Sequence, residues 1–214
     1  MAPSNDQVMI NKVFSSDNTV GAAPAVLQAI MDAGIAIQKP YGKDHYSEQV
    51  EKALAEIFEC PVSVFLVATG TAANALALSV LTPPWGAVLC HPHSHINVDE
   101  CGAPEFFTHG AKLVFIDGDH SKLCPKTLAL KATPNIADVH SVQTSVVSVS
   151  QTTETGSVYS LEELSNIGRI CRDNGLKFHM DGARFTNALV ALDCSPAAMT
   201  WQAGVDVLSF GATK

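Results

Sequence analysis

Several features that point to other classes of protein are missing from this sequence. None of its six cysteines forms a C-x-x-C pair, so neither a disulfide framework nor a zinc site is expected, and reduced thiols of a cytoplasmic protein are favoured. Lys and Arg number 13 against 21 Asp and Glu, without any basic run, which disfavours binding to nucleic acid or to an anionic membrane. Neither G-K-[ST] nor G-x-G-x-x-G occurs, so nucleoside triphosphates and dinucleotides are not favoured ligands.

Charged residues are also scarce. They make up 16% of the 214 residues, and residues 60–98 contain none. A membrane span is one explanation, but turn residues interrupt this stretch, so we favour a buried strand followed by a buried helix. The N-terminus lacks the basic and apolar regions of a signal peptide, and none is expected. So little charge on the surface favours burial in a homo-oligomer.

Short apolar runs alternate with amphipathic segments along the chain. Strands are expected at 62–68, 87–91, 112–117, 142–150, 176–181 and 205–210, and helices at 23–34, 46–58, 71–81, 96–103, 160–175 and 184–192. Apolar strands separated by helices are typical of a mostly parallel sheet covered on both faces, which is a three-layer α/β/α domain. Ligands of such sheets bind at the carboxyl ends of the strands.

Polar residues follow several of the expected strands. Gly70 and Thr71 open a helix, where free amides suit a phosphate, although a simple capped helix explains the pattern as well. Asp181 ends an apolar strand and needs a partner there, either Arg184 or a protonated ring nitrogen of a ligand. Lys214 follows the last strand and could attack an aldehyde through its amine. Together these are the groups that pyridoxal 5'-phosphate (PLP) requires.

Six motifs carry a resemblance to a known family. They are SSDN (15–18), PYGKD (40–44), TGTAAN (69–74), HINVDECGA (95–103), HMDGAR (179–184) and SFGATK (209–214). With them the sequence resembles the PLP enzymes of the aspartate-aminotransferase fold (fold type I), and most closely the low-specificity L-threonine aldolases of the β-eliminating lyase group.

The resemblance implies an activity and a domain organisation. The activity is cleavage of L-β-hydroxy-α-amino acids, such as L-threonine, L-allo-threonine or phenylserine, into glycine and an aldehyde. Residues 1–214 then hold an N-terminal arm and most of the PLP-binding large domain, and the rest of that domain and a small C-terminal domain lie outside the sequence. The family also implies a homotetramer built as a dimer of dimers.

Cofactor contacts are implied by the same resemblance. Lys214 is expected to form the Schiff base, and Asp181 to keep the pyridine nitrogen protonated. Gly70 and Thr71 are expected to bind the phosphate. His95 is expected to lie on the face of the cofactor ring and to be catalytic.

Substrate contacts follow in the same way. Arg184 is expected near the phenolic oxygen of the cofactor or the substrate carboxylate. Ser16 matches the serine that touches the substrate carboxylate, with its neighbour Ser15 as an alternative. Tyr41 is expected to line the pocket, in its own or in a neighbouring subunit.

One stretch departs from the family. Family members commonly carry Glu-Asn-Thr-His where this sequence has Gln-Thr-Thr-Glu at 151–154, so Glu154 stands where a histidine is discussed as a contributor to β-hydroxyl deprotonation. Glu154 is then either a base acting through a water or a loop carboxylate. The change would suit a different β-substituent, as in phenylserine.

Three histidines lie at alternate positions, His91, His93 and His95. This spacing could bind a metal on one strand face, but a strand end beside a cofactor can be rich in histidine, and no metal is expected. Three readings of the function stay open: the aldolase, another PLP reaction such as β-elimination or transamination, and a catalytically silent protein that keeps the fold.

Overall fold

The computed structural model describes Thr19 and residues 21–213. The chain divides into two units, residues 1–37 with 213–214, and residues 38–212. In the described part of the first unit, helix α1 (Pro24–Gly34) begins with Pro24 at its first turn and has no buried residue. The predicted site residues Ser16 and Lys214, with Ser15, lie outside the described residues.

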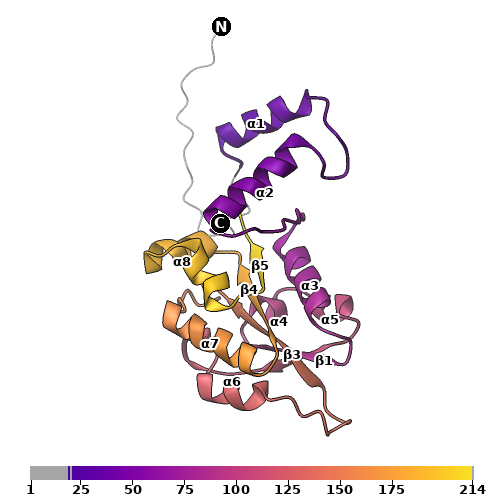
Figure 1. Cartoon of the computed structure of the whole chain (residues 1–214), viewed down its shortest axis with the longest axis vertical. Coiled ribbons are helices and arrows are strands. Elements are labelled where there is room, and N and C mark those ends of the chain that lie inside the picture. Colours follow the sequence, from indigo (N-terminus) through magenta and orange to yellow (C-terminus); the bar gives the residue numbers. More distant parts are fainter. Residues whose placement is uncertain (1–18, 20, 214) are drawn as a thin grey trace. The chain divides into compact units, whose positions relative to one another are not determined.

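A five-stranded sheet forms the centre of the second unit (Figure 1). Its strands are β1 (Gly86–Cys90), β2 (Lys112–Phe115), β3 (Gln143–Ser150), β4 (Lys177–Gly182) and β5 (Val207–Phe210). They lie in the order β2-β1-β3-β4-β5, and every pair is parallel. The predicted parallel sheet is therefore confirmed.

Helices precede these strands and connect them. They are α2 (His45–Ile57), α3 (Gly70–Leu81), α4 (His95–Val98), α5 (Ala103–Phe107), α6 (Pro125–Ala132), α7 (Leu161–Asp173), α8 (Phe185–Leu192) and α9 (Pro196–Met199), with short 3₁₀ turns at Asp119–Ser121 and Trp201–Ala203. A capping box of Ser160 and Glu163 opens α7, because each side chain accepts the other residue's backbone N–H.

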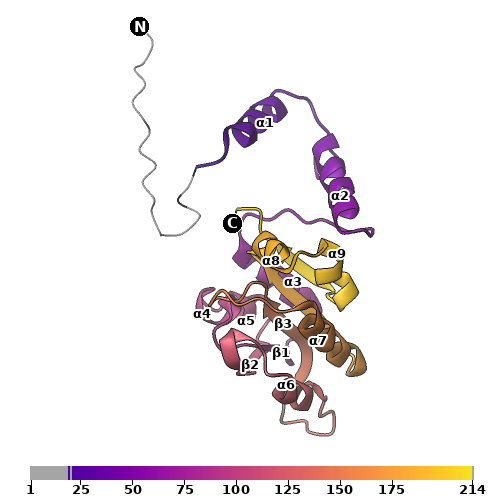
Figure 2. The ribbon, with the colours of Figure 1, turned by 90° about the vertical axis from the view of Figure 1, so that its left-hand side faces the viewer.

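Two apolar cores lie on opposite faces of the sheet, between the strands and the helices that cover them (Figure 2). On one face, Val88, Cys90 and Val146 pack with Leu78 of α3 and Ile96 of α4. The other face packs against α6, α7, α8 and α9 through a larger set, which includes Leu89, Val147, Val149, Phe178 and Met180. Neighbouring residues along a strand point to opposite faces, so strands with continuous apolar runs are covered on both sides. This is the predicted three-layer arrangement.

The strand predicted at 62–68 is wrong. No described strand pairs with these residues, and Phe65 and Leu66 are exposed by 85% and 75%. A β-branched, apolar run favours a strand, but a strand also needs a neighbour for its backbone N–H and C=O groups. Sequence composition could not supply that neighbour.

The uncharged stretch 60–98 includes the 61–69 segment, α3, β1 and α4. None of the helices among the described residues has the length and hydropathy of a membrane span.

The single helix predicted at 96–103 is also wrong. It is two helices, α4 and α5, separated at Cys101 and Gly102, whose φ angles are 49° and 73°. A right-handed helix cannot continue through two consecutive left-handed residues. Helix α6 was missed by the sequence analysis, although Pro125 at its first turn is a starting signal.

Close packing of α7 leaves no room for a side chain at Gly168. A Cβ built there would overlap the backbone carbonyl of Ala203. We predict that Gly168→Ala lowers the free energy of unfolding by about 1–3 kcal/mol or more, as overpacking does. Ser165→Ala, at an exposed position of the same helix, is the control. A urea midpoint of Gly168→Ala equal to that of the control would contradict this packing.

Candidate active site

Three polar side chains lie in one row at the carboxyl end of the sheet. In the parallel register, Ser150 of β3 is opposite Asp181 of β4, and Asp181 is opposite Ser209 of β5. All three are buried. The row lies on the carboxyl edge, where parallel sheets bind ligands.

Asp181 is held by two N–H donors. Its Oδ1 accepts from the backbone N–H of Ala183 at 3.0 Å, and its Oδ2 accepts from Nδ2 of Asn74 at 2.8 Å. Among the described residues, no ion pair joins Asp181 to Arg184. The alternative in which Arg184 merely neutralises Asp181 is therefore not supported. Each carboxylate oxygen keeps a lone pair for a further donor.

Asn74 of α3 connects Asp181 to a second buried carboxylate. Its Nδ2 also donates to Oε1 of Glu100 at 2.7 Å. The same oxygen of Glu100 lies 2.8 Å from Nδ1 of His95. The Glu100 hydrogen bond raises the pKa of His95, against an opposing effect of burial and with help from the charges of Glu100, Asp181 and Asp99.

Glu154 reaches the same histidine from the loop after β3. Its Oε1 accepts from the backbone N–H of His95 at 2.8 Å and from Oγ of Ser150 at 2.6 Å. Ser94, the residue before α4, makes no side-chain cap of its own. Glu154 therefore satisfies a free N–H at the start of α4, where a negative charge is favourable.

His179 lies beneath this row, two residues before Asp181 on the same face of β4. Its Nδ1 lies 2.9 Å from Oγ of Ser148, and its Nε2 lies 3.0 Å from Oγ of Ser209. Complete burial lowers its pKa to about 4, although the charge of Asp181 acts in the opposite direction. A neutral imidazole between two hydroxyls therefore ties three strands together.

The predicted phosphate residues lie at the start of α3. Oγ1 of Thr69 accepts from the backbone N–H of Ala72 at 3.1 Å, which caps the helix. A Cβ built on Gly70 would meet no atom within 4 Å, so the backbone here borders open space. The first amides of a helix have no intrahelical acceptor. Helix α3 thus carries Gly70 and Thr71 one turn before Asn74.

The other predicted site residues have different surroundings. Arg184 immediately precedes α8 and is half-buried. Tyr41 is 95% exposed in a turn with a φ of 63°, and within the described part of the chain no hydrogen bond joins it to the residues around Asp181. Hydrogen bonds connect His95, Asp181 and Glu154 in one network, which Arg184 and Tyr41 do not enter among the described residues.

Three possible metal ligands lie close together here, but they are not the set His91, His93 and His95 that the spacing suggested. Ligand atoms of His95, Glu100 and Asp181 lie within 4.8 Å of one another. Each of these atoms is already engaged by Asn74 or by another member of the group. His91 instead lies 3.2 Å from the carbonyl oxygen of Gly118. Internal hydrogen bonding accounts for the arrangement.

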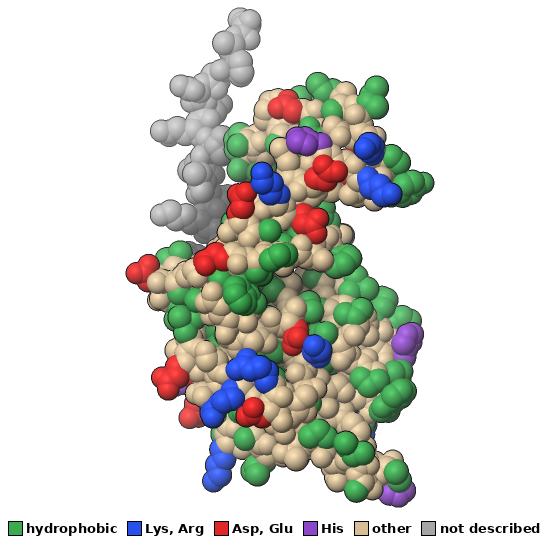
Figure 3. Space-filling model, viewed as in Figure 1, with side chains coloured by type: hydrophobic (Ala, Val, Ile, Leu, Met, Phe, Trp, Pro, Cys, Tyr) green, Lys and Arg blue, Asp and Glu red, His purple; other side chains and the backbone are tan. Residues whose placement is uncertain are grey.

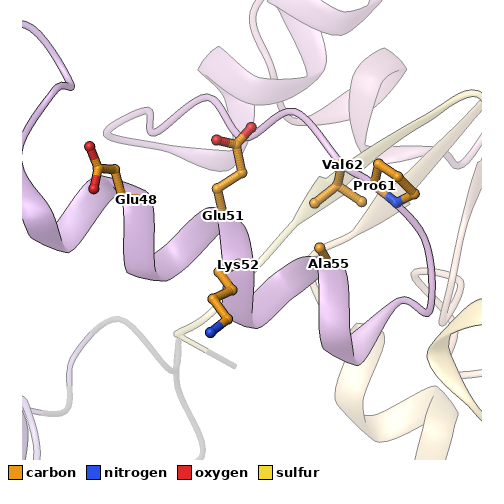
Figure 4. A pocket seen from close by; sticks show the side chains of 6 residues that line it. All are labelled: Glu48, Glu51, Lys52, Ala55, Pro61 and Val62. Atoms are coloured by element: carbon orange, nitrogen blue, oxygen red, sulfur yellow. The ribbon is translucent and has the colours of Figure 1, made fainter.

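A shallow hollow lies elsewhere, between α2 and the start of the 61–69 segment (Figure 4). The residues that line it are Glu48, Glu51, Lys52, Ala55, Pro61 and Val62. None of them is a predicted site residue. It plays no part in the chemistry considered below.

Asn74 and Glu100 were not predicted as site residues. Both lie inside motifs that carry the family resemblance, TGTAAN and HINVDECGA. A signal was present at Asn74, because an amide within an uncharged, alanine-rich helix is costly to bury without partners. Which partners it takes depends on the packing of α3 over β4.

Comparisons with known proteins show the family to which this chain belongs. A family model described as Beta-eliminating lyase matches residues 14–214. A Pseudomonas aeruginosa protein named low specificity L-threonine aldolase is 42% identical over 204 residues, which cover 94% of this chain and 58% of that protein. A Saccharomyces cerevisiae protein of the same name is 28% identical over 81% of this chain and 44% of its own length.

Among solved structures, a threonine aldolase from Leishmania major matches with a TM-score of 0.79 and 30% identity, over 87% of this chain and 54% of that one. The resemblance and the fold class predicted from the motifs are confirmed. The chain spans 58% or less of the length of these three proteins.

The burial of His179 predicts how the stability of the fold depends on pH. Its pKa is about 4 in the folded protein against an ordinary 6.5, so the unfolded chain binds more protons between these values. The free energy of unfolding should therefore fall as the pH decreases through this window, by about 3 kcal/mol in total.

His179→Gln removes this titration but keeps a polar side chain. Thermal unfolding of the full-length protein at about pH 7 and about pH 4.5 should show a smaller loss for His179→Gln than for wild type. The exposed His140 provides the control variant His140→Gln. Equal losses in wild type and His179→Gln would contradict the assignment.

Proposed function

This chain belongs to the β-eliminating lyase family, and we propose that it forms the cofactor-binding part of a PLP-dependent aldolase. The proposed reaction cleaves L-β-hydroxy-α-amino acids into glycine and an aldehyde, with L-threonine and L-allo-threonine as substrates and phenylserine as a further one. The observation that carries the proposal is the network that joins Asp181 and His95 at the carboxyl edge of the sheet, in a chain 42% identical to a protein named for this activity.

The residues present fit PLP. Asp181 is a buried carboxylate with a lone pair left on each oxygen, which suits a protonated pyridine nitrogen. Gly70 borders open space at a helix start, which suits a phosphate. Lys214, outside the described residues, follows β5 by sequence and is the proposed point of covalent attachment.

When bound, PLP supplies an electron sink for the bond-breaking step. The residues of this chain are proposed to do the rest. Asp181 holds a proton on the ring nitrogen, which keeps that sink effective. His95 lies against the ring, and Arg184 binds the substrate carboxylate or the phenolic oxygen. Ser16 is proposed to touch the substrate carboxylate.

Tyr41 is proposed to serve a pocket formed with a neighbouring subunit. Its 95% exposure supports a role across an interface better than one within its own chain. This proposal depends on the assembly considered next.

Apolar exposed residues support a homo-oligomer. Leu76 and Val80 of α3 and Phe106 and Phe107 of α5 are exposed by 49%, 77%, 77% and 48%, on helices that pack against each other. Hydrophobic side chains are visible on the surface of this part of the molecule (Figure 3). Exposed apolar patches commonly mark protein interfaces. The proposed assembly is a dimer of dimers in the cytoplasm, where the six free cysteines would stay reduced.

Two other functions were considered. β-Elimination or transamination would use the same cofactor contacts, and the choice depends on which bond at the substrate Cα lies perpendicular to the ring. A catalytically silent binding protein would have no need for a buried Asp181 with an unused lone pair on each oxygen. The aldolase is favoured because the similar proteins that we report carry that name.

The direct test is glycine release by the purified full-length protein with PLP. L-Threonine, L-allo-threonine and phenylserine should each yield glycine and the matching aldehyde. A 2-keto acid without glycine would instead indicate elimination or transamination; loss of water and ammonia would give 2-oxobutanoate from threonine and phenylpyruvate from phenylserine. No product from any substrate, with PLP bound, would favour the silent protein.

Asp181 should be essential for turnover but not for retention of PLP. We predict that Asp181→Ala lowers kcat on the order of 10²-fold or more, because a preorganised charge at the ring nitrogen is lost. PLP should stay bound through the start of α3. Asp173→Ala, at an exposed position of α7, is the control. Wild-type kcat in Asp181→Ala would refute the proposed role.

Glu154 is proposed to assist deprotonation of the β-hydroxyl without being essential. Its Oε1 is occupied by two donors, so Oε2 is the oxygen left to accept a proton, directly or through a water. Help from His95 or from solvent could partly replace it.

Glu154→Gln should lower kcat on β-hydroxy substrates by up to about 10²-fold, the low end of general-base effects. Exchange of the Cα proton of glycine should be largely preserved, because it involves no β-hydroxyl. An equal loss of both activities would mean that Glu154 supports the site as a whole through α4. Unchanged values for both would make it a bystander.

A further inference from the structure

Glu100 has no assigned role, yet it lies at the centre of the network. Its side chain is 0% exposed. Its Oε1 accepts a hydrogen bond from Nδ2 of Asn74 and lies 2.8 Å from Nδ1 of His95. Its Oε2 has no hydrogen-bond partner among the described atoms. A carboxylate buried in this way is costly unless a cation accompanies it.

His95 is the cation available to Glu100. In the described part of the chain, the ion pairs within 4 Å include no other partner for Glu100. The second carboxylate of the network, Asp181, shares Asn74 with Glu100. Two acidic groups joined by a single amide therefore depend on one imidazole for charge compensation.

This geometry also fixes the histidine ring. A hydrogen on Nδ1 must point to Glu100, so Nε2 is the nitrogen left for a ligand or for solvent. The backbone N–H of the same residue is held by Glu154. Because the side chain of His95 is still 34% exposed, one end of the ring is anchored and the other is open.

We propose that Glu100 is a positioning residue that acts through His95, holding its Nδ1 hydrogen inward and turning Nε2 toward the bound cofactor and substrate. The part of this inference that places cofactor and substrate at Nε2 rests on the proposed function. The contact between Glu100 and Nδ1 of His95 does not depend on it. Asn74 keeps Glu100 in place and, through its second hydrogen, ties the anchor to Asp181.

The charges around His95 agree with this role. Glu100 makes the direct contact; Asp99 comes from its own segment and Asp181 from β4, while Glu154 reaches its backbone N–H from the loop after β3. The contact with Glu100 is the largest cause of the raised pKa of His95. The ion pair therefore stabilises the fold most below the ordinary histidine pKa, and this contribution is lost as the pH rises through the raised value.

The imidazole carbon between the two ring nitrogens carries a hydrogen that exchanges slowly with deuterium from the solvent. The rate of this exchange, followed by mass spectrometry over a pH series, gives the pKa of a single histidine in an intact protein. We would apply it to the full-length protein with and without PLP. Wild-type His95 should titrate above its ordinary range. Glu100→Gln, which keeps the shape but removes the charge, should lower that pKa toward or below the ordinary histidine value.

Asp99→Asn is the matched control, because it removes a neighbouring carboxylate that is exposed. It should shift the pKa of His95 much less than Glu100→Gln does. The dissociation constant of PLP should rise about tenfold in Glu100→Gln, and this change should disappear when His95→Asn is already present, because coupled residues are not additive.

Several outcomes would overturn the proposal. They are an unchanged pKa of His95 in Glu100→Gln, an equal shift in Asp99→Asn, or the same loss of PLP affinity with and without His95→Asn. If Glu100→Gln does not fold, the wild-type titration decides, since a His95 pKa at or below its ordinary value excludes the ion pair. Failure of the aldolase assay alone would leave the titration intact and would count against the proposed function only.

Discussion

The burial of two carboxylates around a single amide is the constraint on which this site depends. Asp181 and Glu100 would repel each other if both were charged without compensation. Nδ2 of Asn74 donates one hydrogen to each, at 2.8 and 2.7 Å, and His95 supplies the positive partner at Glu100. The arrangement explains why an amide side chain is buried in a helix otherwise rich in alanine and leucine. It also makes the positions of α3, α4 and β4 mutually dependent.

The parallel sheet supplies the frame for that constraint. Register places Ser150, Asp181 and Ser209 in one row, and the loops that follow β1 and β3 bring His95 and Glu154 to the same edge. Helix α3 contributes twice, with the open backbone at Gly70 and, one turn later, with Asn74. One helix therefore links the proposed phosphate site to the carboxylate proposed to hold the pyridine nitrogen. A cofactor bound through its phosphate at the start of α3 and through its pyridine nitrogen at Asp181 would keep a fixed position relative to His95.

Much of this could be predicted from the sequence, for a physical reason. Parallel strands end at a common edge, so polar residues after apolar runs had to converge, and Asp181, His95 and Glu154 do. Partner choice could not be predicted. Asp181 was expected to need Arg184 or a ligand, and the two donors that it has within the described chain, Asn74 and the backbone of Ala183, were not foreseen. The expected strand at 62–68 is wrong because the prediction used only the residue types within that segment. A strand also requires a neighbouring strand to pair with, and no described strand pairs with this segment.

The central claim is that this edge of the sheet holds PLP on Lys214. Borohydride reduction of the purified full-length protein with PLP, followed by peptide mass spectrometry, tests it most directly, because reduction makes a Schiff base permanent. The account predicts that the phosphopyridoxyl group is recovered on the peptide that contains Lys214. A label on a different lysine, or no label with PLP in excess, would contradict it.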